Sequence, residues 1–251
     1  MRYTEFNHSP VHRVRLSCII QMLDKAMNGG RGRVLEIGCG VGNVAIPIAS
    51  LGYDVTACDI HEPSVADARR RNVFPNLMFR HGSIESVNPA EYDAVILTEV
   101  LEHVPTCREM IGMIAGSMKK NGLLIVTVPN GWGVTELLCR PSYALKKLPI
   151  GAAAIKALKR LLKTGDLTTA NVSTPHVIFF TLRSLAELFR EHDLTVSSFQ
   201  RFFLLWPLWE TFFSQRTCPA GWPEKDFAMS QKLPPSFCAL WAFALNQAGK
   251  E

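Results

Sequence analysis

Two carboxylates and an imidazole stand close together after an apolar segment of the chain. Glu99, Glu102 and His103 follow residues 92–98, which read as a buried β-strand. In open α/β sheets, ligands bind beyond the carboxyl ends of the strands, so these side chains occupy a position where chemistry takes place. His103 is the best placed titratable group for removing a proton from a bound hydroxyl. The alternative is that Glu102 and His103 only fix the loop after the strand.

A glycine-rich segment earlier in the chain has the features of a ligand-binding loop. The segment Glu36-Ile37-Gly38-Cys39-Gly40-Val41-Gly42 lies between a predicted strand and a predicted helix. Its glycines permit a tight turn and let the backbone approach a ligand at the start of the helix. Asp59, at the end of the second predicted strand, is placed to accept hydrogen bonds from two ribose hydroxyls. The alternative interpretation is a tight turn that binds no ligand.

A nicotinamide dinucleotide is the competing ligand for such a loop. Its fingerprint requires Gly-x-Gly-x-x-Gly, in which the third glycine permits close packing of the helix. Counted from Gly38, that third glycine would fall at Asn43. The acid at Glu36, two residues before the first glycine, is also not part of the dinucleotide pattern. The spacing therefore argues against a dinucleotide.

The elements that position these residues alternate between strand and helix. We expect strands at residues 34–37, 54–58, 77–81, 92–98 and 123–128, and helices at 9–27, 43–51, 63–72 and 108–119. This alternation predicts a parallel sheet with right-handed crossovers. It lapses after Pro129. Beyond that point we expect helices at 152–163 and 181–191, strands at 194–199 and 237–245, and an aromatic, proline-containing loop over 202–235.

Four consecutive segments resemble a known family. They are VLEIGCGVGNVAIPIA, the acid in ACDI, YDAVILTEVLEHV and MKKNGLLIVTVPN. Together they look like class I S-adenosyl-methionine (SAM)-dependent methyltransferases, most of all the group with the ubiquinone-biosynthesis O-methyltransferases. The later segment TPHVIFFTLRSLAELFREHDLTV is similar to the same group. The resemblance implies SAM as the cofactor. It also implies an α/β, doubly wound, Rossmann-like fold: a seven-stranded, mostly parallel sheet with its last strand antiparallel and helices on both faces.

The resemblance also implies where the cofactor binds. It assigns the methionine end to Glu36, Gly38, Gly40 and Gly42, the ribose to Asp59, the adenine to the loop with Ser83 and Ile84, and further cofactor contacts to Ile60 and Glu99. The family usually has an acid at position 83. A serine there accepts a hydrogen bond from the adenine amino group more weakly than a carboxylate does.

A metal site is a second implication of the resemblance. The ubiquinone enzymes and small-RNA 2′-O-methyltransferases have a Glu-x-x-Glu-His motif with a distant histidine that holds a divalent metal. Here Glu99, Glu102, His103 and His176 resemble that set, although residues 175–180 lack the tryptophan and the charged residue of those relatives. Such a metal would polarise an acceptor hydroxyl, and His103 would then be a ligand and not the base.

These motifs leave three functions open. The one we favour is O-methylation of a small or amphipathic acceptor that bears a hydroxyl group. The alternatives are an RNA 2′-O-methyltransferase with the metal site, and a cofactor-binding scaffold without catalysis. The motifs are specific for the cofactor and the fold but not for the acceptor.

The net charge of +5 is concentrated in one part of the chain. Residues 140–163 hold seven basic residues and no acidic one, and the remainder is slightly acidic. This distribution argues against a general nucleic-acid binder. The helix expected at 152–163 is basic and amphipathic, so it can contact an anionic membrane or cover an acidic substrate. The alternative is an ordinary solvated helix.

The length and the cysteines limit the architecture further. A chain of 251 residues suits one sizeable α/β core, so we expect a single domain over 1–251 with variable cap segments at about 131–174 and 202–235. The seven cysteines are scattered, which gives no sign of a disulfide framework or a zinc site. The N-terminus has no signal-peptide pattern, and the apolar-rich run 202–213 is too short to span a membrane. We therefore expect a cytoplasmic protein.

Overall fold

The computed structural model describes residues 10–28, 31–133, 136–137, 176–205 and 221–248. The predicted helix at 152–163, the basic stretch at 140–163 and most of the first cap segment lie outside the described residues. Within the described part, no helix is both long enough and apolar enough to cross a membrane.

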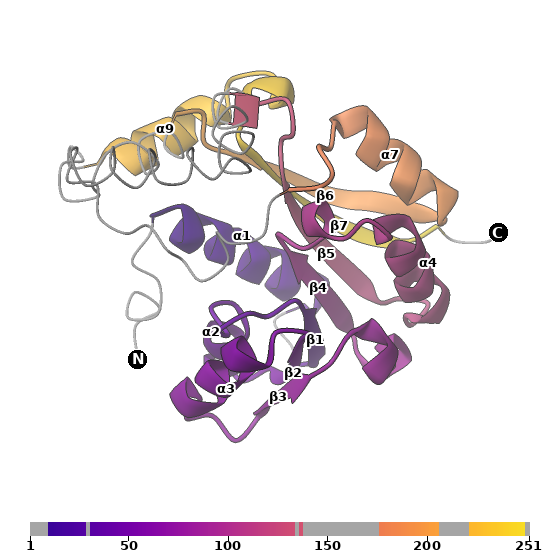
Figure 1. Ribbon diagram of the computed structural model, residues 1–251. Coiled ribbons are helices and arrows are strands. Elements are labelled where there is room, and N and C mark those ends of the chain that lie inside the picture. The colour runs from indigo at the N-terminus through magenta and orange to yellow at the C-terminus, as the bar shows by residue number, and fades with distance from the viewer. Residues whose placement is uncertain (1–9, 29–30, 134–135, 138–175, 206–220, 249–251) are drawn as a thin grey trace, which may run out of the picture.

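The described chain contains seven strands and helices that flank them (Figure 1). The strands are β1 (Arg33–Ile37), β2 (Asp54–Asp59), β3 (Leu77–His81), β4 (Ala94–Thr98), β5 (Leu123–Pro129), β6 (Leu194–Phe202) and β7 (Leu240–Gln247). The α-helices are α1 (Pro10–Ala26), α2 (Ala45–Ser50), α3 (Glu62–Arg71), α4 (Cys107–Ser117), α7 (Leu182–Glu191) and α9 (Trp222–Ser230). Short 3₁₀ turns are η2 (Ile84–Ser86), η3 (Pro89–Glu91), η4 (Leu101–His103) and η6 (Pro235–Phe237).

The strands form one sheet in the order β3-β2-β1-β4-β5-β7-β6. The five strands from β1 to β5 are parallel, and β7 is antiparallel to both of its neighbours. The predicted seven-stranded fold is therefore confirmed. Because the five parallel strands end at the same edge, the loops after β1, β2, β3, β4 and β5 lie together there. The strand order reverses between β1 and β4, which is where ligands bind in open α/β sheets.

Two apolar layers hold the sheet between its helices. One layer packs α1, α2, α3 and α9 against one face, and the other packs α4 and α7 against the opposite face (Figure 1). The central strands β4 and β5 are buried along their whole length, as their runs of valine, isoleucine and leucine require. This rigid centre fixes the loops at the carboxyl edge.

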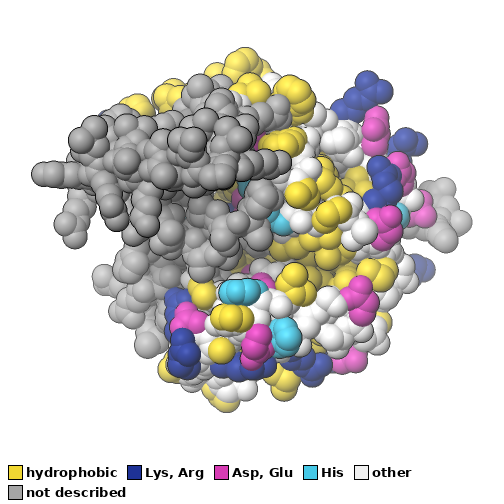
Figure 2. Space-filling view, viewed as in Figure 1, with side chains coloured by type: hydrophobic (Ala, Val, Ile, Leu, Met, Phe, Trp, Pro, Cys, Tyr) yellow, Lys and Arg dark blue, Asp and Glu magenta, His cyan; other side chains and the backbone are white. Residues whose placement is uncertain are grey.

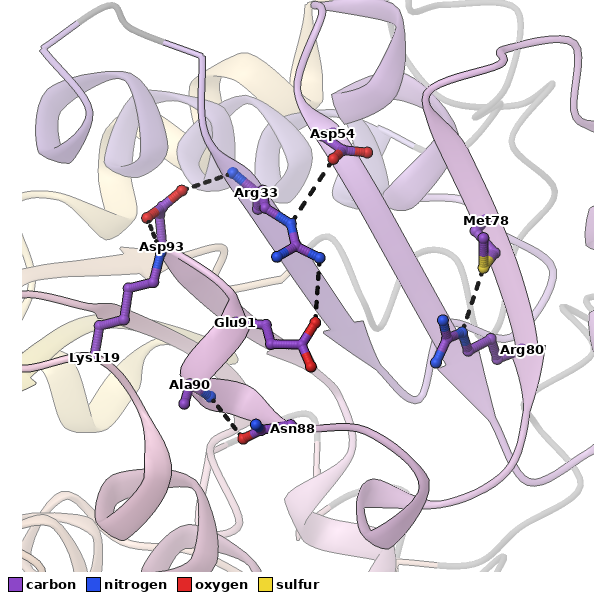
Figure 3. A network of polar contacts seen from close by, with 9 residues as sticks. All are labelled: Arg33, Asp54, Met78, Arg80, Asn88, Ala90, Glu91, Asp93 and Lys119. Carbon is purple, nitrogen blue, oxygen red and sulfur yellow. Dashed lines mark hydrogen bonds and ion pairs between the residues drawn. The ribbon is translucent and has the colours of Figure 1, made fainter.

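A polar network ties the strands at the opposite, amino-terminal edge (Figure 3). The backbone N–H of Arg33 donates to Asp93 Oδ2 (2.8 Å), and Lys119 Nζ lies 2.6 Å from Asp93 Oδ1. The Arg33 guanidinium also contacts Glu91 (3.3 Å). Arg33 begins β1, Asp93 directly precedes β4, Glu91 lies in η3 before β4, and Lys119 lies in the turn between α4 and β5. Because the ion pairs are partly exposed, each adds at most about 1 kcal/mol to stability.

The C-terminal part corrects two predictions. The loop expected over 202–235 is wrong for Trp222–Ser230, which form α9. Pro223 in the first turn and Gly221 at the N-cap position are signals for the start of a helix. The aromatic and proline residues of 202–235 favoured a loop and outweighed these signals. The last strand begins at Leu240 and not at residue 237, because η6 occupies 235–237. The buried Phe202 and Phe203 belong to the core.

Candidate functional site

The glycine loop after β1 has backbone φ angles that residues other than glycine rarely adopt. Gly38, Gly40 and Gly42 all have positive φ angles. A Cβ atom on Gly38 would lie 2.4 Å from Val100 Cγ2, and one on Gly42 would lie 2.7 Å from Phe79 Cζ. Both positions therefore require glycine. The loop leads into the helical turn before α2, and backbone N–H groups at the start of a helix can bind an approaching group.

Asp59 links this loop to the end of β2. The Gly40 N–H donates to Asp59 Oδ2 (2.7 Å), and the His61 N–H donates to Asp59 Oδ1 (2.8 Å). Each carboxylate oxygen has a second lone pair, so Asp59 can still accept hydrogen bonds from two hydroxyls. Ile60, the next residue, is 75% exposed at the same edge. The arrangement fits a diol bound between the ends of β1 and β2.

The loop after β3 lies at the same edge of the sheet. Ile84 is buried there, and the Ser83 hydroxyl donates to the carboxylate of Glu85. Glu85 therefore brings a carboxylate next to the position where the family usually has an acid. The sequence-based interpretation missed this residue, although an acid two positions after Ser83 was visible in the sequence.

Glu36 is a buried carboxyl group at the end of β1. Its Oε2 atom has no hydrogen-bond partner among the described residues, and its side chain is almost fully buried. Burial raises the pKa of Glu36 to about 8, and the negative charge of Asp59 adds to the rise. A hydrogen bond from the Ala45 N–H and the charge of Arg15 act in the opposite direction. A cationic group that donates a hydrogen bond to Oε2 would supply the partner that this atom lacks.

A second cluster follows β4 and joins three chemically active side chains. The ligand atoms of Glu102, His103 and His176 all lie within 4.8 Å of one another. His103 Nε2 lies 3.8 Å from Glu102 Oε1, and the two imidazole rings are 5.0 Å apart. The N–H groups of Val177 and Ile178 donate to the backbone oxygen of Glu102 (2.8 and 3.1 Å), which brings His176 to η4.

Glu102 is the most deeply buried member of this cluster. Within the described part of the chain, neither of its carboxylate oxygens has a hydrogen-bond partner. Burial, followed by repulsion from Glu99, holds the pKa of Glu102 well above its usual range. One carboxylate and two imidazoles are a suitable partial ligand set for a divalent metal. The residues therefore fit a metal, as they also fit a proton-transfer site.

A family model described as Methyltransferase domain matches residues 12–198 of the chain. The chain belongs to this methyltransferase family. The family predicted from the sequence motifs is therefore confirmed.

Curated relatives of this methyltransferase match about half of it. A protein named Ubiquinone biosynthesis O-methyltransferase from Rickettsia felis is 31% identical over 126 residues, which are 48% of this chain and 51% of the relative. A second of the same name, from Bradyrhizobium diazoefficiens, is 33% identical over 124 residues, or 47% and 49% of the two chains. The chain thus spans about half the length of the curated relatives it matches.

A solved structure of similar fold is the magnesium protoporphyrin IX methyltransferase of Synechocystis with bound SAH. It has a TM-score of 0.57 at 15% identity and covers 94% of this chain and 83% of its own. This likeness shows the methyltransferase fold.

The structure separates Glu99 from the other three predicted metal ligands of this methyltransferase. Glu99 has a left-handed backbone (φ 55°), and its carboxylate accepts a hydrogen bond from the Thr127 hydroxyl (3.0 Å). Arg15 forms an ion pair with its other oxygen (3.5 Å). Glu99 therefore lies beside the cluster of Glu102, His103 and His176 and is held by different partners.

Two further residues of the methyltransferase site escaped the sequence-based interpretation. Glu136 is buried and its Oε1 lies 3.2 Å from His176 Nδ1. No local pattern in the sequence indicated this pairing. Arg15 is buried on α1, where its position matches the helical spacing of the core residues Ile19 and Met22. An arginine at core spacing was a visible signal for a buried ion pair.

Proposed function

We propose that this methyltransferase binds SAM at the carboxyl edge of the sheet and transfers its methyl group to an acceptor oxygen. The observation that carries the proposal is the buried Glu36 carboxyl, whose Oε2 has no hydrogen-bond partner among the described residues, beside a loop that requires glycine. SAM supplies an activated methyl group on a positively charged sulfonium. Such a ligand also carries an ammonium group, which suits Glu36, and a ribose diol, which suits Asp59.

The other cofactor contacts follow from the same edge. Gly38, Gly40 and Gly42 admit the methionine end, Ile60 lies beside the ribose, and Ser83 with Ile84 meets the adenine. Glu99 at the end of β4 faces the sulfonium region. These residues would hold the methyl group in line with the acceptor, and this alignment is the main source of rate acceleration.

His103 is the proposed proton acceptor. It lies at the end of β4, partly exposed and next to the buried Glu102. A neutral imidazole there can take the proton of an acceptor hydroxyl as the oxygen attacks.

A small or amphipathic acceptor is favoured by the apolar side chains at this edge. Among them, Ile60, Trp132 and Val177 are 75%, 56% and 50% exposed. In the part of the face that Figure 2 colours by residue type, hydrophobic side chains gather across the middle, and charged side chains lie along the right and lower margins. The names of the curated relatives point in the same direction, toward a hydroxyl on a quinone precursor. Host lysate incubated with SAM labelled in its methyl group, followed by mass spectrometry, tests this. Label in a small hydroxyl compound supports the proposal, and label confined to RNA contradicts it.

A divalent metal is the second candidate for the chemistry. The observation that favours it is the buried Glu102, whose carboxylate has no hydrogen-bond partner in the described structure, within 4.8 Å of two imidazoles. Glu102, His103 and His176 would hold the ion, which would polarise the acceptor hydroxyl. A metal-dependent enzyme would use His103 as a ligand and not as the base.

Binding of SAM should depend on Asp59. In Asp59→Ala, the ribose hydroxyls lose their acceptor and the Gly40 N–H loses its partner, so affinity should fall by about 1–3 kcal/mol, or roughly 5–150-fold. Isothermal titration calorimetry with SAM measures this. Asp54→Ala is the matched control, because Asp54 begins the same strand at the opposite edge and is exposed. Equal affinity in wild type and Asp59→Ala would contradict the assignment, and binding of a nicotinamide dinucleotide instead would reverse the choice of cofactor.

We also propose that residues 140–163 make a peripheral contact with an anionic membrane. The support is the concentration of basic residues in this stretch, and each basic residue near an anionic bilayer contributes about 1 kcal/mol. Wild type should sediment with anionic vesicles at low salt and less at physiological salt, where the Debye length is about 8 Å. Changing Lys156, Lys159, Arg160 and Lys163 to glutamate should abolish sedimentation and preserve SAM binding. A wild-type protein that stays in the supernatant at low salt excludes the membrane contact.

A further inference from the structure

Arg15 is a buried cation at the proposed cofactor site. It is 7% exposed, and no other lysine or arginine among the described residues is buried. Its two terminal nitrogens have different partners: Nη1 lies 3.5 Å from Glu99 Oε2, and Nη2 lies 2.6 Å from His12 Nδ1. Glu99 is 84 residues away in the sequence, so the packing of α1 brings the positive charge to the end of β4.

The contact with His12 does not change the charge of Arg15. A guanidinium has only donors, so His12 Nδ1 must accept the hydrogen bond and carry no proton. Burial, with a smaller effect from Arg15, lowers the pKa of His12 to about 3, so this imidazole is neutral at physiological pH. The pair therefore contributes one positive charge to the site.

The positive charge of Arg15 acts on three carboxyl groups. Glu99 pairs with Arg15 directly, and the charge of Arg15 also lowers the pKa of Glu36 and of Glu102, against the effect of their burial. In a site shielded from water, such charges interact more strongly than they would on the surface. The Thr127 hydroxyl holds the other oxygen of Glu99, so that this carboxylate is fixed from two sides.

We propose that Arg15 is a positioning residue that fixes Glu99 and sets the net charge around the sulfonium. The inference rests on the proposed function, because it concerns SAM bound between Glu36 and Glu99. Methyl transfer turns the cationic sulfonium into the neutral thioether of S-adenosyl-homocysteine (SAH). Carboxylates without a counter-charge would hold the cation more tightly in the ground state than in the transition state, where its charge disperses, and would slow the reaction. Arg15 prevents this and keeps the affinities for SAM and SAH close.

The test compares the dissociation constants of SAM and SAH by calorimetry in three proteins: wild type, Arg15→Met and Arg15→Lys. In Arg15→Met the carboxylates lose their counter-charge and hold the sulfonium more tightly, so the ratio of the SAH constant to the SAM constant should rise about tenfold. A uniform loss of packing would weaken both ligands equally and leave this ratio unchanged. In Arg15→Lys, which keeps the charge, the ratio should stay near that of wild type. Equal weakening of both ligands in Arg15→Met would show a merely structural role and overturn the inference.

Glu99→Gln provides a second variant that does not depend on the folding of Arg15→Met. It removes one negative charge, so the ratio should fall below the wild-type value, and an unchanged ratio would overturn the inference. The double variant Arg15→Met/Glu99→Gln should return toward wild type. Failure of the wild type to bind either SAM or SAH would instead refute the proposed function, so the two failures are distinguishable.

Discussion

Replacing His103 by alanine should lower the rate of methyl transfer by roughly 10²–10⁴-fold. The expected cause is the loss of the group that accepts the proton of the acceptor hydroxyl. The affinity for SAM should stay close to that of wild type, because the assigned cofactor contacts come from other residues. The rate is measured as transfer of labelled methyl from SAM to the acceptor that the wild type modifies in lysate, and affinity is measured by calorimetry.

Chelator and His176→Ala distinguish the two roles open to His103. If His103 is a metal ligand, a chelator should abolish activity and His176→Ala should have an effect as large as His103→Ala. If His103 is the base, activity should survive the chelator. An enzyme that tolerates the chelator and both substitutions would show that Glu102 and His103 only hold the loop after β4.

The affinity for SAM should rise with pH by up to about tenfold per unit between pH 6 and pH 8. Burial raises the pKa of Glu36 to about 8 in the cofactor-free protein, so the carboxyl is largely neutral below that pH. The positive charge of SAM favours the ionised form of the Glu36 carboxyl, so binding of SAM releases a proton. At lower pH this proton is harder to release, and the affinity for SAM therefore falls. Above pH 8 this contribution levels off. Calorimetry in buffers with different ionisation enthalpies measures both the affinity and the proton count.

Glu36→Gln is the control for this pH dependence. It keeps the shape of the side chain and removes its titration, so binding should be weaker and independent of pH over the same range. The neighbouring thiols do not contribute, because burial raises the pKa of Cys58 to about 12 and also raises the pKa of Cys39. An affinity of the wild type that is constant from pH 6 to pH 8, without proton release, would contradict the assigned role of Glu36.

The strands and the glycine loop were predictable because their signals are local. Apolar runs such as 123–128 determine a buried strand, and Gly38 and Gly42 have to be glycine because of their φ angles and close neighbours. The carboxyl edge then follows from the parallel order, so the positions of Asp59 and His103 at one edge could be inferred without coordinates.

The pairing of side chains within the site was not predictable in the same way. The resemblance to metal-dependent relatives placed Glu99 and Glu102 in one ligand set, but Glu99 has a left-handed backbone and its carboxylate contacts Arg15 and Thr127. Glu136 meets His176 across 40 positions of sequence. Such contacts depend on tertiary packing, which periodicity does not encode. The helix α9 was missed for a different reason: its start signals were present but were outweighed by aromatic and proline residues.

The contact between Glu136 and His176 bears on how chains of this kind diverge. Their side chains touch, and nearby the Gly131 N–H donates to the backbone oxygen of Phe180 (3.0 Å). The two points at which the described chain is interrupted, after Leu137 and before His176, therefore lie side by side. Because these ends already meet, a change in the number of residues between them would not require the strands or the glycine loop to move.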